Sequence, residues 1–117
     1  SASWDTTDIV AVGASNADIA LAVNRVVALQ GGAVVCDRGE VVEEFALPVF
    51  GIMSALPLED VLQRARSFSD AAAGLGVPFR DPLLSLITLT GAAIPFLRVC
   101  EEGLVDLKTG ETLGLLV

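Results

Sequence analysis

The segment FALPVFGIMSALP, residues 45–57, joins a strand-like run to a helix-like run, and the rest of the chain is arranged around it. It contains two prolines and one glycine, as a surface loop does, yet it carries no charged residue. An exposed apolar loop typically marks contact with another domain or subunit. We therefore predict an interface formed by Leu47, Pro48, Val49, Phe50, Ile52 and Met53. Within it we expect Leu47, Val49 and Phe50 to be exposed, and Ile52 and Met53 to fill space between the next helix and the sheet.

Length and composition predict one globular domain. A chain of 117 residues buries roughly two-thirds of its unfolded surface, enough for a core without metal or disulfide staples. We expect a polar lead-in over residues 1–7 and a single domain over residues 8–117. No apolar run approaches the ~20 residues that cross a bilayer, and no secretory series opens the sequence. The sequence thus favours a cytoplasmic protein without a membrane partner.

The charge distribution argues against nucleic acid as a partner. Fifteen acidic residues outweigh seven basic ones, giving a net charge of −8, and the basic residues are scattered along the chain. Only Arg64 and Arg66 are close in sequence, and on a helix they point to different sides. Cys36 and Cys100 are too few and too far apart for a disulfide framework, so we expect them to be reduced.

The N-terminal half predicts strand, helix, strand and strand. Ser15 or Asn16 caps the helix, and Gly31-Gly32 ends it. Its apolar residues recur at helical spacing: Ile19, Ala22, Val23, Val26 and Leu29. The expected strands are residues 8–13, which would pair in parallel with the second strand, then residues 33–36 and residues 40–45, the last two joined by a tight turn at residues 37–39.

The C-terminal half predicts a second helix followed by more strands. Pro57 lies near the first turn of that helix, whose buried face would hold Leu58, Val61, Leu62, Ala65, Phe68, Ala72 and Leu75. Residues 83–90 fit a strand or a short helix, and we favour the strand. Further strands are expected at residues 94–100, 104–107 and 113–117. The predicted fold is an α+β two-layer sandwich with two main helices on a mixed, mostly antiparallel sheet of about six strands, in the order β-α-β-β-α-β-β-β.

Few residues offer catalytic chemistry. The chain has no histidine and no tyrosine, which removes the commonest general base and the commonest zinc ligand. Glu40, Glu43, Glu44, Glu59 and Asp60 could gather into a hard-cation site, although their spacing is not that of a calcium loop and solvated surfaces are the more favoured interpretation. The turn at residues 13–16 could hold an anion, but Ser15 more simply caps its own helix.

Three segments resemble the C-terminal domain of adenine deaminase, a family within the metal-dependent amidohydrolases. They are Asp8–Gly13 leading into DIALAVNR at residues 18–25, LPVFGIMS at residues 47–54, and residues 81–106 from Asp81-Pro82 to Leu104-Val105-Asp106. The resemblance covers nearly the whole chain.

The resemblance implies an N-terminal barrel that carries the metal-ligand histidines and hydrolyses adenine to hypoxanthine and ammonia. Manganese, iron or zinc would belong to that barrel, and no cofactor is expected in this chain. The family usually shows a His-Asp-Ser-His-Asn-like run before the first strand, whereas this chain has Trp4-Asp5-Thr6-Thr7-Asp8, in which only Asp5 keeps its type.

Three hypotheses about function follow. The first is a non-catalytic accessory domain whose apolar loop docks on an amidohydrolase barrel or on a second copy of itself. The second is a domain of an active aminohydrolase that contributes Asp5 or Asp8 to the active site. The third is a free-standing small-molecule-binding module that uses the turn at residues 13–16.

Overall fold

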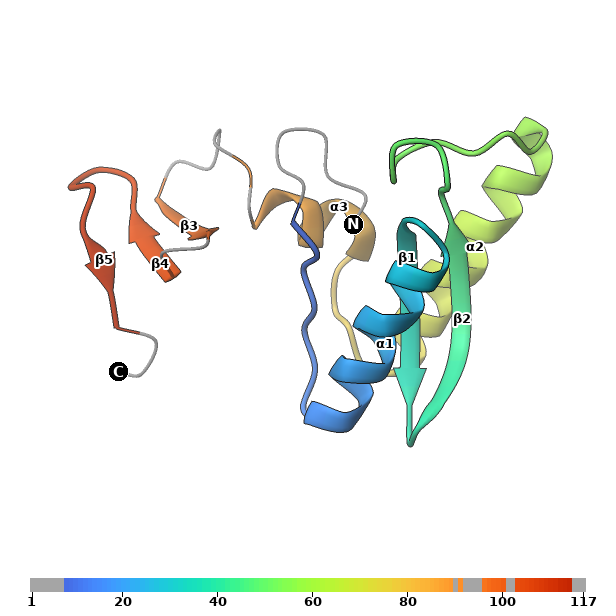
Figure 1. Ribbon diagram of the computed structural model, residues 1–117, viewed down its shortest axis with the longest axis horizontal. Coiled ribbons are helices and arrows are strands. Elements are labelled where there is room, and N and C mark those ends of the chain that lie inside the picture. Colours follow the sequence, from blue (N-terminus) through green and yellow to red (C-terminus); the bar gives the residue numbers. More distant parts are fainter. Residues whose placement is uncertain (1–7, 90, 92–95, 101–102, 115–117) are drawn as a thin grey trace.

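The computed structural model describes residues 8–89, 91, 96–100 and 103–114 of the chain. Its elements (Figure 1) are, in order, α1 (Asn16–Ala28), β1 (Gly32–Asp37), β2 (Glu40–Ala46), α2 (Leu58–Gly74), α3 (Pro82–Thr88), β3 (Leu97–Cys100), β4 (Gly103–Asp106) and β5 (Thr112–Leu113). The strands form two separate antiparallel sheets, β1-β2 and β3-β4-β5. The predicted α+β class is confirmed, but the described strands do not join into one mixed sheet.

Helix α1 begins and ends where its sequence indicates. The Ser15 hydroxyl accepts a hydrogen bond from the N–H of Asp18 at 3.3 Å, so Ser15 serves as the N-cap. The Asp18 carboxylate accepts a second bond at 2.7 Å from the N–H of Gly39, which ties the start of α1 to the β1–β2 turn. At the other end, Gly31 and Gly32 have φ values of +125° and +120° and let the chain reverse into β1.

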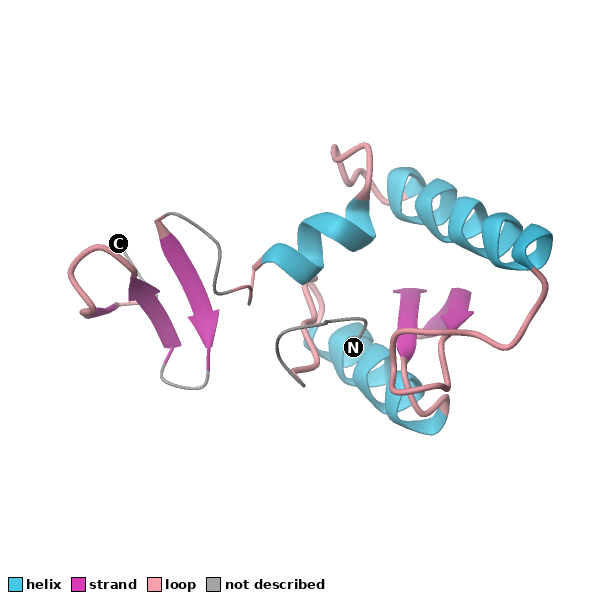
Figure 2. Cartoon of the chain, turned by 90° about the horizontal axis from the view of Figure 1, so that it is seen from above, coloured by secondary structure: helices cyan, strands magenta, loops and turns pink. Residues whose placement is uncertain are grey.

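The β1–β2 hairpin lies between α1 and α2, which cover its opposite faces (Figure 2). Arg38 and Gly39 both have positive φ, as the two central residues of a type I′ hairpin turn require, so the predicted turn is confirmed. The register shifts between Val35 and Cys36, which marks a β-bulge.

The core lies on the α2 face of the hairpin. Alternation along β1 and β2 turns Ala33, Val35 and Phe45 toward α2, where they pack with Leu47, Phe68 and Ala72. Phe68 is the most completely buried of these side chains. Leu58, Leu62 and Leu75, which were expected on the buried face of α2, are exposed instead. The prediction was wrong for these three leucines, whereas Phe68 and Ala72 lie in the core as expected.

Residues 82–88 form helix α3, so the favoured prediction of a strand there was wrong. The Asp81 carboxylate accepts a hydrogen bond from the N–H of Leu84 at 2.9 Å, and Pro82 occupies the first turn. An aspartate cap followed by proline is a helix start. These two residues outweigh the β-like composition that follows them.

Strands β3, β4 and β5 form a small meander beyond α3 (Figure 1). The strands predicted at 94–100 and 104–107 are confirmed as β3 and β4, with slightly different ends. Of the strand predicted at 113–117, only Leu113 lies in β5 and Gly114 lies outside it, while residues 94–95 and 115–117 lie outside the described residues. Within the part of the chain that the structure describes, the meander packs little against the hairpin and helices. Leu97, Val99 and Leu113 are consequently exposed.

Residues 8–13 form no strand, so the expected parallel pairing with β1 was wrong. The composition is that of a strand, but a strand also needs a neighbouring edge for its backbone hydrogen bonds, and this segment has none among the described residues. The lead-in, residues 1–7, lies outside the described residues.

Candidate functional site

The apolar loop closes in a tight turn, Val49–Met53, which we call the apolar turn. Its ends are bridged as in a hairpin: the N–H of Val49 donates to the carbonyl of Met53 at 3.1 Å, and the N–H of Met53 donates back at 3.0 Å. The N–H of Ile52 also donates to the carbonyl of Val49, and the two residues between them, Phe50 and Gly51, have φ values of +55° and +76°. These are the features of a type I′ turn. Phe50 is thus held at the tip.

The apolar turn exposes most of its side chains. Phe50 is 89% exposed, and Val49, Ile52 and Met53 are exposed to a lesser degree. Pro48 is exposed as well. The exposure expected for Val49 and Phe50 is confirmed, whereas Leu47 is buried in the core and Ile52 and Met53 do not fill the interior. Leu47 turns inward because it continues the α2-facing side of β2 two residues after Phe45.

The apolar turn is anchored by contact between two glycines. A Cβ added to Gly31 would lie 2.4 Å from the Cα of Gly51 and 2.9 Å from the carbonyl oxygen of Leu47. The N–H of Leu47 donates to the carbonyl of Gly31 at 3.1 Å. The end of α1 therefore supports the turn through its backbone. The sequence predicted the helix end at Gly31 but gave no sign that its partner would be Gly51, twenty positions later.

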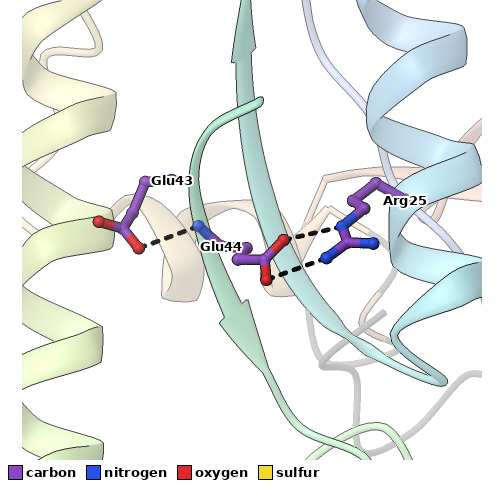
Figure 3. A network of polar contacts seen from close by, with 3 residues as sticks. All are labelled: Arg25, Glu43 and Glu44. Atoms are coloured by element: carbon purple, nitrogen blue, oxygen red, sulfur yellow. Dashed lines mark hydrogen bonds and ion pairs between the residues drawn. The ribbon is translucent and has the colours of Figure 1, made fainter. Parts of the chain in front are cut away.

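An ion pair ties α1 to β2 (Figure 3). The Arg25 guanidinium donates two hydrogen bonds to the Glu44 carboxylate, from Nε at 2.8 Å and from an Nη at 3.1 Å. The hydrogen bond from Arg25 lowers the pKa of Glu44 below its ordinary value, while partial burial opposes the shift. The same contact raises the pKa of Arg25. Glu44 is thereby assigned to a structural role rather than to a cation site.

The stability of the domain should decline in acid partly through Glu44. A carboxyl group whose pKa is lowered by folding stabilises the folded state above its unfolded pKa, and this contribution is lost as the pH falls through the folded pKa. The loss should therefore begin near the ordinary value of 4.5 and continue below it. Thermal unfolding of Glu44→Gln, followed from about pH 7 to about pH 3, should give a lower midpoint at neutral pH and a weaker acid dependence than the parent chain.

The matched control is Glu40→Gln, on the same strand, because Glu40 forms no ion pair with the described residues. This change should leave the acid dependence nearly as in the parent chain. An acid dependence of Glu44→Gln equal to that of the parent chain would contradict the assignment.

The structure describes one of the two aspartates, Asp5 and Asp8, that were predicted to contribute to an active site. Asp5 lies outside the described residues. Asp8 is half-buried, and its Oδ2 atom is buried without a hydrogen-bond partner. The Nε atom of Arg98 on β3 is buried in the same way. A buried carboxylate oxygen without a hydrogen-bond partner destabilises the folded state. Asp8 can therefore accept a hydrogen bond that the described residues do not supply.

The described residues offer little that resembles an enclosed catalytic site. Among them, no group of three or more His, Cys, Asp or Glu residues could hold a metal ion, so they do not fit the divalent cation that the resemblance implies for the barrel. Two depressions lie on one side of α2, and both involve Gln63 and Ser67. Cys36 and Cys100 form no disulfide within the part of the chain that the structure describes. Burial raises the pKa of the Cys36 thiol, which makes it less reactive at neutral pH. In the part of the chain described, no helix combines the length and apolarity needed to cross a bilayer.

Comparison with known families identifies the family of the chain. A family model described as "Adenine deaminase C-terminal domain" matches residues 1–111. The chain belongs to this family. The resemblance read from the sequence is thereby confirmed, and the chain is an accessory domain of the adenine deaminase family.

Proteins named adenine deaminase match this domain over most of its length. That of Methylobacterium sp. (strain 4-46) is 46% identical over 102 residues, which are 87% of this chain and 18% of the relative. That of Methylobacterium nodulans is 42% identical over 110 residues, 94% of the chain and 20% of the relative. That of Brucella abortus (strain 2308) is 40% identical over 112 residues, 96% of the chain and 19% of the relative. The chain thus spans about a fifth of the length of these relatives.

Proposed function

We propose that the chain is a non-catalytic accessory domain of an adenine deaminase-like hydrolase, and that the apolar turn docks it on the part of the enzyme that carries the catalysis. The parent reaction would be the hydrolysis of adenine to hypoxanthine and ammonia. The observation that carries the proposal is Phe50, an aromatic side chain that is 89% exposed at the tip of an anchored turn.

The backbone of Phe50 supports the proposal. A bulky residue other than glycine rarely adopts a positive φ, and such strain costs on the order of 1–3 kcal/mol. In a free-standing domain, an exposed ring at this position offsets none of that cost. In a complex, the ring would enter an apolar pocket and be desolvated, as aromatic residues at the centres of interfaces commonly are.

The surroundings of the turn support the same use. Leu56 and Leu58 follow it in sequence and are 49% and 67% exposed, and Leu62 lies one helical turn beyond Leu58. They add exposed apolar side chains to the stretch of chain that follows the turn. The sequence has no histidine, so any histidine-dependent chemistry of the parent enzyme would come from outside this chain. A divalent metal, manganese, iron or zinc, would likewise be held there.

Asp8 favours a second candidate function. Its Oδ2 atom is buried and unpaired, and the segment that follows is free of backbone bonds. In this candidate the domain presents the Asp8 carboxylate to the catalytic site and takes part in turnover. The two candidates differ in whether the parent reaction depends on that carboxylate.

Ammonia release from adenine tests both candidates in one assay. The chain by itself, with added manganese, iron or zinc, should release no ammonia above the blank. The full-length enzyme with Asp8→Asn, which keeps the shape of the side chain and removes its charge, should turn over at the parental rate.

Turnover by the isolated chain that persists through repurification would overturn the proposal. A decrease in kcat of the Asp8→Asn enzyme by at least about tenfold, with KM unchanged, would favour the second candidate instead.

A further inference from the structure

We infer that residues 8–13 bind as an added β-strand to the edge of a sheet in the catalytic portion of the parent enzyme. This inference rests on the proposed function for the identity of the partner. It concerns a second contact, made by backbone hydrogen bonds and separate from the apolar turn.

The sequence of the segment is that of a strand. It reads Asp-Ile-Val-Ala-Val-Gly, and three of its six residues are β-branched. The structure gives it an elongated course that leads into α1 (Figure 1). Its local preference and its path are therefore those of a strand, and only the pairing is missing.

The backbone of the segment is unpaired. No N–H or C=O group of residues 8–13 forms a hydrogen bond with the described residues. Val12 is 74% exposed and Ile9 is 39% exposed. An exposed β-branched segment with a free row of donors and acceptors is a template for strand addition and a liability if left open.

The position of the segment indicates its partner. The family model describes a C-terminal domain, and the relatives are about five times as long as the chain, so in those proteins most of the polypeptide precedes the matched part. Residues 8–13 are the first described residues of the domain, so in sequence they are its nearest described part to the polypeptide that precedes the domain in the relatives. Covalent linkage to the catalytic portion raises the effective concentration of its sheet edges above that of a second copy.

Amide hydrogen exchange in the full-length enzyme tests the inference. A strand paired along one edge has every second N–H bonded, so alternate amides should be protected: those of Ile9, Ala11 and Gly13, or those of Val10 and Val12. Exchange at the protected set should be slowed by more than about tenfold relative to the other set. The amides of α1 provide the internal reference for a folded domain.

A matched pair of proline variants tests the same pairing by an independent route. Ala11→Pro and Val12→Pro each remove one N–H from an exposed position with no hydrogen bond to lose within the described residues, and proline is compatible with an extended backbone. Only the proline that removes a hydrogen-bonded N–H should abolish the protection of the remaining amides. The proline at the other position should leave that protection in place.

Each other outcome overturns the inference. Free exchange at all five amides excludes strand addition. Protection that is equally present in the isolated chain, with α1 also protected, assigns the pairing to this domain itself. Protection that disappears on dilution of the full-length enzyme assigns it to a second copy.

The failure of this inference can be told apart from the failure of the proposed function. If substitution of Phe50 weakens docking while residues 9–13 exchange freely, only the added strand is wrong. If the alternating protection is present and substitution of Phe50 has no effect, the apolar turn is not the docking surface.

Discussion

Replacing Gly31 with alanine should lower the stability of the domain by about 2–4 kcal/mol and its thermal midpoint by about 10 °C or more. Two effects combine. The new Cβ would lie 2.4 Å from the Cα of Gly51, a backbone atom that cannot rotate away, and the φ of +125° is unfavourable for any residue with a side chain. Relief requires the apolar turn to separate from the end of α1. Differential scanning calorimetry of the purified chain measures the change.

Gly39→Ala separates the clash from the backbone strain. Gly39 has a φ of +82°, but a Cβ there would meet nothing within 4 Å. The free energy of unfolding of the control should therefore fall by only about 1 kcal/mol, the usual cost of placing alanine in the left-handed region. Equal losses for the two variants would show that the Gly31–Gly51 contact does not support the turn.

Replacing Phe50 with aspartate should weaken docking on the catalytic portion by about thirtyfold or more, the loss typical of a central aromatic residue at an interface. The ring would be replaced by a charge that the partner's apolar pocket cannot pair. The folded domain should be nearly unaffected, because Phe50 is 89% exposed and aspartate tolerates a positive φ. The measurement is the dissociation constant between this chain and the rest of the parent enzyme, produced as separate polypeptides.

Phe79→Asp is the matched control. Phe79 lies between α2 and α3, away in sequence from the apolar turn, and is 57% exposed. Its replacement should leave the dissociation constant within about twofold of the parental value. If both variants bind as the parent chain does, the apolar turn has no part in docking.

The sequence predicted those parts of the fold that depend on local chemistry. The Ser15 cap, the glycines that end α1 and the turn at Arg38-Gly39 each require only neighbouring residues, and all three are confirmed. Helix α3 was also predictable, because Asp81 and Pro82 form a local start signal that should have outweighed the composition of the residues after it.

The features that escaped prediction depend on partners far away in the chain or outside it. Residues 8–13 have strand composition, but composition does not reveal whether an edge is available for pairing. The burial of Leu47 follows from the register of β2, and the ion pair between Arg25 and Glu44 joins residues nineteen positions apart. The strain at Phe50 could have been suspected from the Phe-Gly pair at the centre of a short loop, because such a turn places both residues at positive φ.

Site-specific cross-linking from position 50 shows directly what the ring of Phe50 contacts in the full-length enzyme. A photoreactive benzoyl-phenylalanine replaces Phe50 in the full-length enzyme and, in a parallel control, Phe79. Irradiation followed by peptide mass spectrometry then identifies the residues within reach of each ring. We predict that position 50 cross-links to the catalytic portion of the same enzyme and that position 79 does not. Cross-links from position 50 that are confined to this domain, or that reach only a second copy of it, would show that the apolar turn does not dock on the catalytic portion.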